Sequence, residues 1–267
     1  LAVANATMEK AIRVISVERG YDPRRFTLVA FGGAGGLHAC ALAAALGIPR
    51  VQVPKFPGAL SALGILRSDV VKDYVRTLLL PVADETRLRK LLARHFAELE
   101  RQARAALRDE GFLGARQRLE RALDLRYRGQ AYELTLPYGK NFVAAFHRAH
   151  RRRYGYADPA RAVEIVNVRL RALGLTQKPA LLRQAHAGRA PQAAWYKRTR
   201  VSFPEGALAT DFYVRERLRP GNRLRGPAVI AEYSATTLVP PGWHARMDAY
   251  ENLLLEPAGG RQAGTMK

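Results

Sequence analysis

The most distinctive chemical pattern in the sequence is the glycine-rich segment Phe31-Gly-Gly-Ala-Gly-Gly-Leu-His-Ala39. It follows a short apolar run and opens into the alanine-rich stretch 40–46. A glycine turn between a buried strand and a helix lets the backbone approach a ligand closely, and it points the free amides of the helix start at that ligand. The same turn can also be a structural joint, and its glycines fit neither G-x-G-x-x-G nor a P-loop. Taken alone, the segment leaves both interpretations open.

A second group of candidate residues lies where an alternating apolar and polar segment ends, at Asp124, Arg126, Tyr127 and Gln130. Gly129 interrupts the alternation, and the loops that follow strands often carry functional side chains. These residues are therefore candidates for a substrate-facing or subunit-interface site. An alternating strand also places Asp and Arg on its solvated face for structural reasons, so a purely structural interpretation stays open.

Histidines and serines give weaker signals. His147 and His150 are three residues apart on an expected helix, a spacing that can share a metal ion, but no third ligand has a convincing spacing. We therefore expect a surface pair and no metal site. His95 falls on or beside an apolar helix stripe, which favours a partly buried structural histidine. Ser61 and Ser234 have no recognisable base partner, and neither G-x-S-x-G nor a catalytic triad can be assembled.

Composition places limits on the function. The formal net charge is +21, with 36 Arg and 8 Lys against 23 acidic residues, and such an excess can indicate nucleic-acid binding. The basic residues are spread along the whole chain, with one tight run at 151–153. An arginine-rich coding background is the simpler explanation, so we do not expect a nucleic-acid partner.

The single cysteine, Cys40, can form neither an internal disulfide nor a cysteine-based metal site, which fits a reducing cytoplasm. No stretch reaches the roughly 18–20 uninterrupted apolar residues that cross a bilayer, so we expect no membrane contact. Because the sequence begins at Leu1 without an initiator Met, we expect a piece of a longer chain.

The glycine segment is flanked by elements that would position it. Residues 4–18 have the apolar spacing of an amphipathic helix ended by Gly20, and residues 27–31 form a continuous apolar strand of the kind buried on both faces. A helix to residue 46 and a strand over 51–53 complete a βαβ unit, which requires a parallel sheet. A turn with a short helix over 56–65 and a strand over 70–80 follow.

The rest of the chain reads as a compact α+β domain that begins after residue 81. The exposed linker is expected at 176–192. The expected helices cover 84–110 and 142–153. The expected strands cover 119–127, 131–136, 163–173, 195–203, 211–214, 228–231, 236–239 and 252–255.

The glycine segment continues into a longer pattern that runs in order along most of the chain. Its further parts are Asp124-Leu-Arg-Tyr-Arg-Gly-Gln130, Tyr154-Gly-Tyr156, Glu164-Ile-Val-Asn-Val-Arg169, Gly226-Pro-Ala-Val-Ile230, Ser234-Ala-Thr-Thr237 and Pro240-Pro-Gly242. From about residue 26 to 255 this pattern resembles the hydantoinase A/5-oxoprolinase family, which is related to sugar kinases and actin.

The resemblance implies an α/β actin-like (sugar kinase-like) ATPase lobe fragment over 1–80, an α+β, strand-rich C-terminal domain over 81–257 and a disordered tail over 258–267. It also implies that Gly32, Gly33, Ala34 and Gly35 lie against the adenosine of ATP. Mg²⁺ is implied as well, with most phosphate and metal ligands outside this chain.

The implied activity is ATP-dependent ring opening of a cyclic amide, such as 5-oxoproline or an N-methylhydantoin, through phosphorylation of its carbonyl. The implied partner is a hydantoinase B-type subunit, separate or fused. Two alternatives stay open. One is an ATP-dependent ketone carboxylase subunit of the same family, of the acetone carboxylase beta type, and the other is a non-catalytic module that docks a partner.

Two departures from the family pattern limit these expectations. We find no D-x-G-x-T phosphate loop, so the isolated chain is expected to be inactive. Family members often carry Pro where this chain has Gly36, and the change should loosen the first turn of the helix.

Overall fold

The computed structural model describes residues 1–259 and divides them into two compact units. Unit 1 contains residues 1–65 together with the part of the chain from residue 179, and unit 2 contains residues 66–178. The two compact units therefore do not meet at a single boundary near residue 81, because the last strands of the chain belong to the same sheet as its first strands. The domain ranges 1–80 and 81–257 remain a proposal. From residue 260 on, the expected disordered tail lies outside the described residues.

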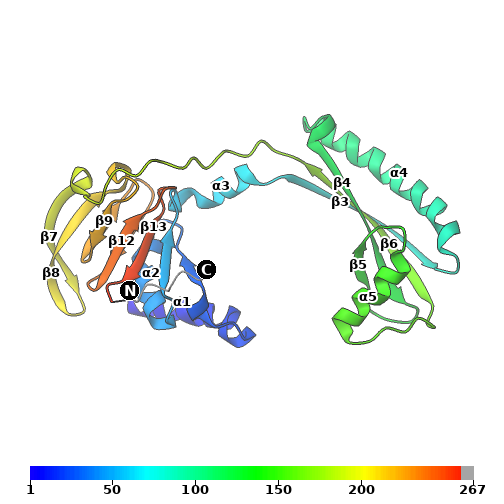
Figure 1. Cartoon of the computed structure of the whole chain (residues 1–267), viewed down its shortest axis with the longest axis horizontal. Helices are drawn as coiled ribbons and strands as arrows, with labels where there is room; N and C mark the ends of the chain where they lie inside the picture. The colour runs from blue at the N-terminus through cyan, green and yellow to red at the C-terminus, as the bar shows by residue number, and fades with distance from the viewer. Residues whose placement is uncertain (260–267) are drawn as a thin grey trace. The chain divides into compact units, whose positions relative to one another are not determined.

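The first sheet of unit 1 combines both ends of the chain (Figure 1). Strands β1 (Thr27–Val29) and β2 (Arg50–Val53) pair in parallel and are joined by helix α2 (Gly35–Leu46), which confirms the expected βαβ unit. Three antiparallel strands extend the sheet beyond β2, in the order β13 (Leu253–Pro257), β12 (Trp243–Met247) and β9 (Arg223–Arg225).

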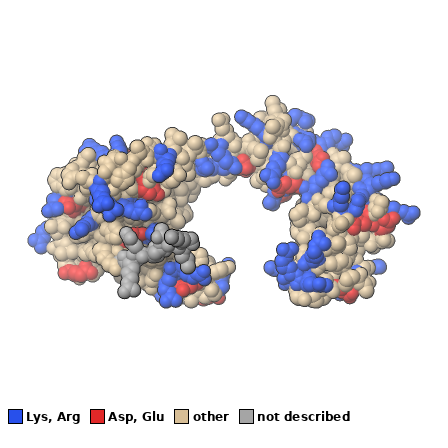
Figure 2. Space-filling view, in the orientation of Figure 1, with Lys and Arg blue, Asp and Glu red and all other residues tan. Residues whose placement is uncertain are grey.

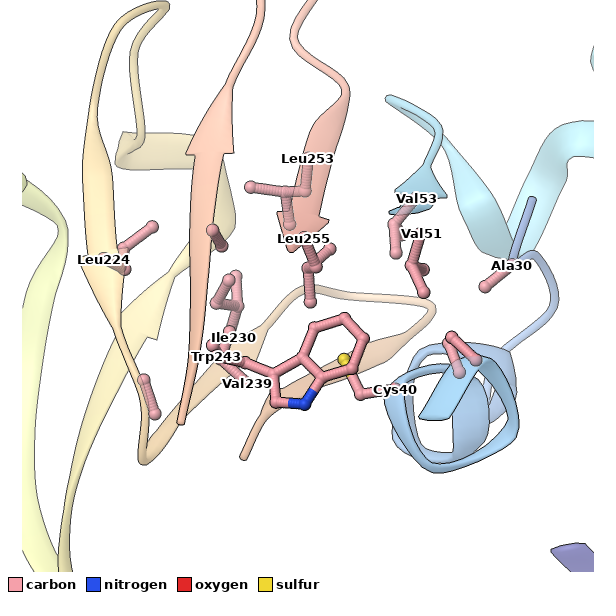
Figure 3. Packing of buried hydrophobic residues seen from close by; sticks show 14 of the residues in the cluster. Ala30, Cys40, Val51, Val53, Leu224, Ile230, Val239, Trp243, Leu253 and Leu255 are labelled. Atoms are coloured by element: carbon pink, nitrogen blue, oxygen red, sulfur yellow. The ribbon is translucent and has the colours of Figure 1, made fainter. Parts of the chain in front are cut away.

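A second sheet closes unit 1 on the other side of the core. Its strands run in the order β11 (Thr236–Val239), β10 (Ala228–Ala231), β8 (Gly206–Val214) and β7 (Trp195–Phe203). Apolar side chains from both sheets and from α2 meet in one cluster, where Cys40 of α2 lies near Trp243 of β12 (Figure 3). Burial raises the pKa of the Cys40 thiol to about 12. The N-terminal half of unit 1 is thus held by strands from the C-terminal end.

Strand β1 is an edge strand, and this overturns one expectation. The apolar run 27–31 predicts burial on both faces, but Val29 is 46% exposed and Phe31 is 54% exposed. Only β2 borders this strand, so one edge and much of its surface stay open. Helix α1 (Ala2–Ile15) has no fully buried residue and contacts the core mainly through Ile12.

Unit 2 is an antiparallel sheet covered by two helices. The strands run in the order β3 (Val70–Pro81), β6 (Val163–Gly174), β4 (Gln117–Tyr127) and β5 (Leu134–Pro137). Helices α4 (Glu85–Asp109) and α5 (Phe142–Tyr154) pack their apolar sides on this sheet. Asp84 caps α4 by accepting from the amides of Thr86 and Arg87. Phe96 is fully buried in this core, whereas its neighbour His95 is half-buried, as expected for a partly buried structural histidine.

The face of the unit 2 sheet opposite the helices carries rows of ion pairs. Arg171 makes a two-pronged pair with Asp73, with N···O distances of 2.8 and 2.9 Å, and Arg118 pairs with Glu120. Many arginines on this face are thus neutralised by a neighbour. Figure 2 shows one face of the molecule, where basic side chains are present on both units and acidic side chains are interspersed among them.

The remaining elements are short. They are helix α3 (Leu60–Arg67) and the 3-10 turns Val17–Arg19, Pro23–Arg25, Pro57–Ala59, Gly114–Arg116, Gln192–Ala194 and Arg215–Arg217. Strands β9 and β12 were not predicted, although Trp243, Ala245 and Met247 alternate with polar residues as a strand requires. Within residues 1–259, no helix combines the length and the apolar character needed to span a membrane.

Candidate functional site

The glycine turn, residues 32–36, begins with a backbone conformation that only glycine adopts readily. Gly32 has φ +87°, and its N–H donates to the Pro57 carbonyl over 2.8 Å. Ala34 precedes helix α2, and no side chain caps the helix start. The Leu37 amide donates to the Ala34 carbonyl over 3.0 Å, which leaves the amides of Gly35 and Gly36 as the first-turn donors without an acceptor in the helix.

The inner side of the glycine turn packs against residues 234–237, which we call the threonine turn. The Thr236 amide donates to the Gly33 carbonyl over 3.0 Å. A Cβ on Gly33 would lie 3.2 Å from the Ser234 carbonyl, and one on Gly36 would lie 2.7 Å from both the Thr236 carbonyl and Thr237 Oγ1. Gly33 and Gly36 therefore have a packing reason to be glycine.

This contact bears on the departure from proline at Gly36. The sequence predicts a loosened first helical turn, but Gly36 is buried and fits tightly against the threonine turn. The missing side chain allows close approach of α2 and β11. Gly58 likewise allows a close approach to the threonine turn, because a Cβ there would collide with Ser234.

The outer side of the glycine turn is open. Gly33 and Ala34 are exposed, and a Cβ on Gly35 would have only ordinary contact, 3.8 Å from the Ala30 carbonyl carbon. The packing interpretation therefore applies to part of the turn, and the ligand interpretation stays a prediction for the open part. Gly33 and Gly36 fix the packing, while Ala34 and Gly35 face the space in front of an uncapped helix start.

A buried ion pair that was not predicted from the sequence supports the threonine turn. Arg215 Nη2 donates to the Pro54 carbonyl over 2.6 Å, and Arg215 Nη1 lies 3.4 Å from Glu232 Oε1. Burial lowers the pKa of Arg215 and raises the pKa of Glu232. The Glu232 amide donates to the Ala235 carbonyl, so this pair ties the turn to the end of β2.

Asp124 belongs to unit 2 and is fully buried, at 0% exposed, which corrects the expectation of a solvated strand face. Its carboxylate accepts from Thr135 Oγ1 over 2.6 Å, from Asn167 Nδ2 over 2.7 Å and from Arg169 Nε over 2.5 Å. Thr77 Oγ1 extends the row to Asn167 over 2.8 Å. Every partner is a side chain of the same sheet, so these hydrogen bonds link its four strands through Asp124 and Asn167. Both carboxylate oxygens of Asp124 are therefore occupied within the sheet.

Arg126 and Tyr127 are also held by internal partners. Arg126 Nε donates to Glu164 over 2.5 Å. The Tyr127 ring is buried, its hydroxyl shares a hydrogen bond of 2.7 Å with His147 Nδ1, and the same oxygen accepts from the Asp158 amide over 2.8 Å. Burial, and to a lesser degree His150, lower the pKa of His147.

Gln130 lies at the border of a small cavity. It donates weakly, over 3.3 Å, to both His150 Nε2 and the Tyr156 hydroxyl. His150 is 1% exposed and donates through Nδ1 to the Tyr156 carbonyl over 2.8 Å, so it is not the surface histidine expected from sequence. With Tyr132 and Tyr154, these residues line a cavity of about 180 Å³.

The structure separates the expected site residues into two groups. Gly32–Gly35 lie in unit 1, and Asp124, Arg126, Tyr127 and Gln130 lie in unit 2. Ser234 packs against glycines, and His95 contacts Arg76 Nη1 over 3.3 Å. No cluster of three or more potential metal ligands occurs among residues 1–259.

Comparison with known families gives matches over almost the whole chain. Residues 1–74 match the family model described as hydantoinase/oxoprolinase, and residues 81–257 match the model described as hydantoinase/oxoprolinase C-terminal domain.

Three relatives illustrate the similarity. An uncharacterized protein of Methanocaldococcus jannaschii is 35% identical over 261 residues, caprolactamase subunit alpha of Pseudomonas jessenii is 32% identical over 270, and 5-oxoprolinase 1 of Arabidopsis thaliana is 30% identical over 264. Each match covers 96% of this chain but only 37%, 39% and 20% of the relative. The chain thus spans between a fifth and two fifths of these proteins.

Solved structures agree with this assignment. The nucleotide-free structure of acetone carboxylase, an enzyme of ATP-dependent acetone carboxylation, superimposes with a TM-score of 0.89 at 23% identity, which establishes the fold alone. The match covers 96% of this chain and 39% of the acetone carboxylase chain. The ATP-dependent caprolactamase of Pseudomonas jessenii gives a TM-score of 0.65 at 31% identity, over 97% of this chain and 39% of that chain.

Proposed function

Because the chain belongs to the hydantoinase/oxoprolinase family, we propose that it is the C-terminal part of an ATP-dependent enzyme that opens cyclic amides. Relatives named as a caprolactamase subunit and a 5-oxoprolinase are 32% and 30% identical over 96% of the chain. The observation that carries the proposal within this chain is the open outer side of the glycine turn.

The glycine turn fits a nucleotide. A sugar or base can approach the backbone at Ala34 and Gly35, where no side chain stands in the way, and the uncapped start of α2 offers amide donors. The packed inner side at Gly33 and Gly36 would hold this surface rigid. In this proposal β1, α2 and β2 form one wall of an actin-like nucleotide cleft, and the exposed edge of β1 leaves room for further strands.

Bound ATP would supply the phosphoryl group that makes an amide carbonyl reactive toward water. Phosphoryl transfer depends on positioning and on charge neutralisation by Mg²⁺ and fixed donors. Residues 1–259 contain no cluster of metal-ligating side chains, so the proposal places the Mg²⁺ and phosphate ligands in additional sequence, consistent with the greater length of the relatives.

Unit 2 is proposed to support substrate or partner binding. Of its four candidate residues, Gln130 has the strongest claim to touch a ligand. It borders the cavity of about 180 Å³, and the hydrogen bonds that its side-chain amide donates are long, at 3.3 Å each. Asp124, Arg126 and Tyr127 would act as supports, since internal partners occupy their polar atoms. A B-type subunit is the proposed partner, in line with the relative named as a subunit alpha.

The test is calorimetry with ATP–Mg²⁺ on the full-length protein that carries this chain. Gly35→Val fills the outer side of the turn without a packing clash, so affinity should fall at least tenfold while the melting temperature changes little. Gly139→Val is the matched control, because a Cβ there meets nothing within 4 Å and the residue lies in unit 2. Unchanged affinity in Gly35→Val would remove the glycine turn from the nucleotide site. Hydrolysis assays with caprolactam and 5-oxoproline then test the substrate class.

A further inference from the structure

A larger cavity lies at the other edge of the first sheet of unit 1. It has a volume of about 510 Å³ and is bounded by residues 183–186, by β9 with the turn before it, and by the end of β12. Strands β1 and β9 are the two edges of the five-stranded sheet, so this cavity is separated from the glycine turn by the intervening strands. Cavities of this size commonly hold small molecules.

The segment 183–187, which we call the strap, contributes residues 183–186 to the lining of the cavity and is fixed by backbone hydrogen bonds. The Gln184 amide donates to the Ala249 carbonyl over 2.8 Å, and the Ala187 amide donates to the Pro220 carbonyl over 2.9 Å. The His186 ring lies directly on Gly221, where a Cβ would collide with it. His186 Nδ1 accepts from the Gly188 amide over 3.2 Å, which leaves Nε2 as the donor of the neutral ring.

Three arginines line this cavity from three different elements. Arg183 comes from the strap, Arg223 from β9 and Arg246 from β12. Arg223 and Arg246 are direct cross-strand neighbours, so their side chains project from the same face of the sheet. Like charges in directly opposed positions destabilise a sheet. Among the described residues, no carboxylate forms an ion pair with any of the three, whereas Arg171 and Arg198 each have one.

The acidic residue that borders the cavity is committed elsewhere. The Asp248 carboxylate accepts from the Tyr250 amide over 2.8 Å, from the Asn252 amide over 2.9 Å and from Asn252 Nδ2 over 3.0 Å. It therefore closes the turn between β12 and β13. The three arginines outnumber this one carboxylate, so the lining keeps an excess of positive charge.

We propose that this cavity binds a small oxyanion with two or more negative charges, carried by phosphate or carboxylate groups. A planar guanidinium recognises both groups through paired hydrogen bonds, and a ligand between Arg223 and Arg246 would remove their repulsion. Arg183 and His186 would then close over the ligand from the strap. The site is independent of the proposed nucleotide site.

The test is calorimetry with inorganic pyrophosphate on the full 267-residue chain at about 0.15 M salt, where bulk charge is strongly screened. Wild type should bind, and both Arg223→Gln and Arg246→Gln should weaken binding by roughly tenfold or more. Arg225→Gln is the matched control, since Arg225 lies on the same strand, faces the same side and does not line the cavity. It should change affinity less than about twofold.

Three further measurements test whether binding depends on this cavity and on its arginine pair. Gly35→Val, where the added Cβ has only ordinary contact, should still bind pyrophosphate, because the glycine turn is not involved. Without ligand, Arg246→Gln should melt at the same temperature as wild type or higher, because it relieves like-charge repulsion. Pyrophosphate should raise the melting temperature of wild type more than that of Arg246→Gln. Citrate in place of pyrophosphate tests whether the ligand carries carboxylate groups. The probe that binds more tightly shows whether the cavity prefers phosphate or carboxylate.

The proposal is overturned if neither probe binds wild type, or if Arg225→Gln weakens binding as much as Arg246→Gln does. It is also overturned if Arg246→Gln lowers the melting temperature and leaves the affinity unchanged, because the arginine would then have a structural role only.

Discussion

The close packing of Gly36 against the threonine turn makes the substitution Gly36→Ala a direct test of how the glycine turn is held. The added Cβ would lie 2.7 Å from the Thr236 carbonyl and from Thr237 Oγ1, and 3.0 Å from Thr237 Cα. The threonine turn cannot easily yield, because the Thr236 amide is bonded to Gly33 and β11 pairs with β10. Overpacking of this kind costs about 1–3 kcal/mol.

Helix propensity works in the opposite direction. Alanine is favoured over glycine inside a helix by up to about 1 kcal/mol. We therefore expect Gly36→Ala to lower the free energy of unfolding of unit 1 by about 1–2 kcal/mol, with the clash outweighing the propensity. Gly35→Ala is the matched control one residue earlier, where the Cβ has 3.8 Å of space, and it should be neutral or slightly stabilising.

The measurement is urea unfolding followed by tryptophan fluorescence. Both tryptophans of the chain, Trp195 and Trp243, belong to unit 1, so the signal reports on that unit alone. If Gly36→Ala is as stable as wild type, or if Gly35→Ala loses as much stability, the packing argument is refuted. Glycine at position 36 would then have no structural reason in this fold.

Three further outcomes follow from the buried groups. Asp124→Ala should destabilise unit 2 by about 2–4 kcal/mol in thermal unfolding, because it leaves buried hydrogen-bond partners unsatisfied. Asp73→Ala is the control on the same sheet and should cost less than about 1 kcal/mol, because its ion pair is exposed. Equal losses of stability in the two variants would contradict the burial of Asp124. The pKa of His147 is lowered from its ordinary 6.5, so its contribution to stability is present above that pH and lost as pH falls below it; melts between about pH 7.5 and 5.5 should show this loss, and His147→Gln should reduce it. Cys40, with a pKa of about 12, should react with a thiol reagent near pH 8 only after unfolding, and fast labelling of the native chain would disprove its burial.

Local sequence predicted most elements of this fold because their signals are short-range. Asp84 marks the start of α4 by capping it, and Gly47 ends α2 in a left-handed conformation. The apolar spacing between such signals then fixes the length of each helix. β9 was missed because it has only three residues and pairs with β12, whereas the alternation of Trp243, Ala245 and Met247 in β12 was a signal that the prediction overlooked.

The candidate sites were predicted less well, because burial depends on what packs above a residue. Asp124 alternates with apolar residues as a solvated residue would, yet three side chains from other strands surround it. His150 has the spacing of a surface histidine, but the Tyr127 ring of β4 and the ring of Tyr156 pack against it. Neither neighbourhood is visible from the spacing along one strand or helix.

By itself, the sequence determined the glycine turn, the βαβ unit around it and the ordered motifs that place the chain in its family, because each depends on residues close together in the chain. Only the tertiary structure showed that these motifs meet in pairs: Gly33 with the threonine turn, Arg126 with Glu164, Asp124 with Arg169, and Gln130 with Tyr156. The physical reason is that hydrogen bonds and packing between distant segments are set by strand order and register. The glycine turn thus packs one side against its own fold and leaves the other side open.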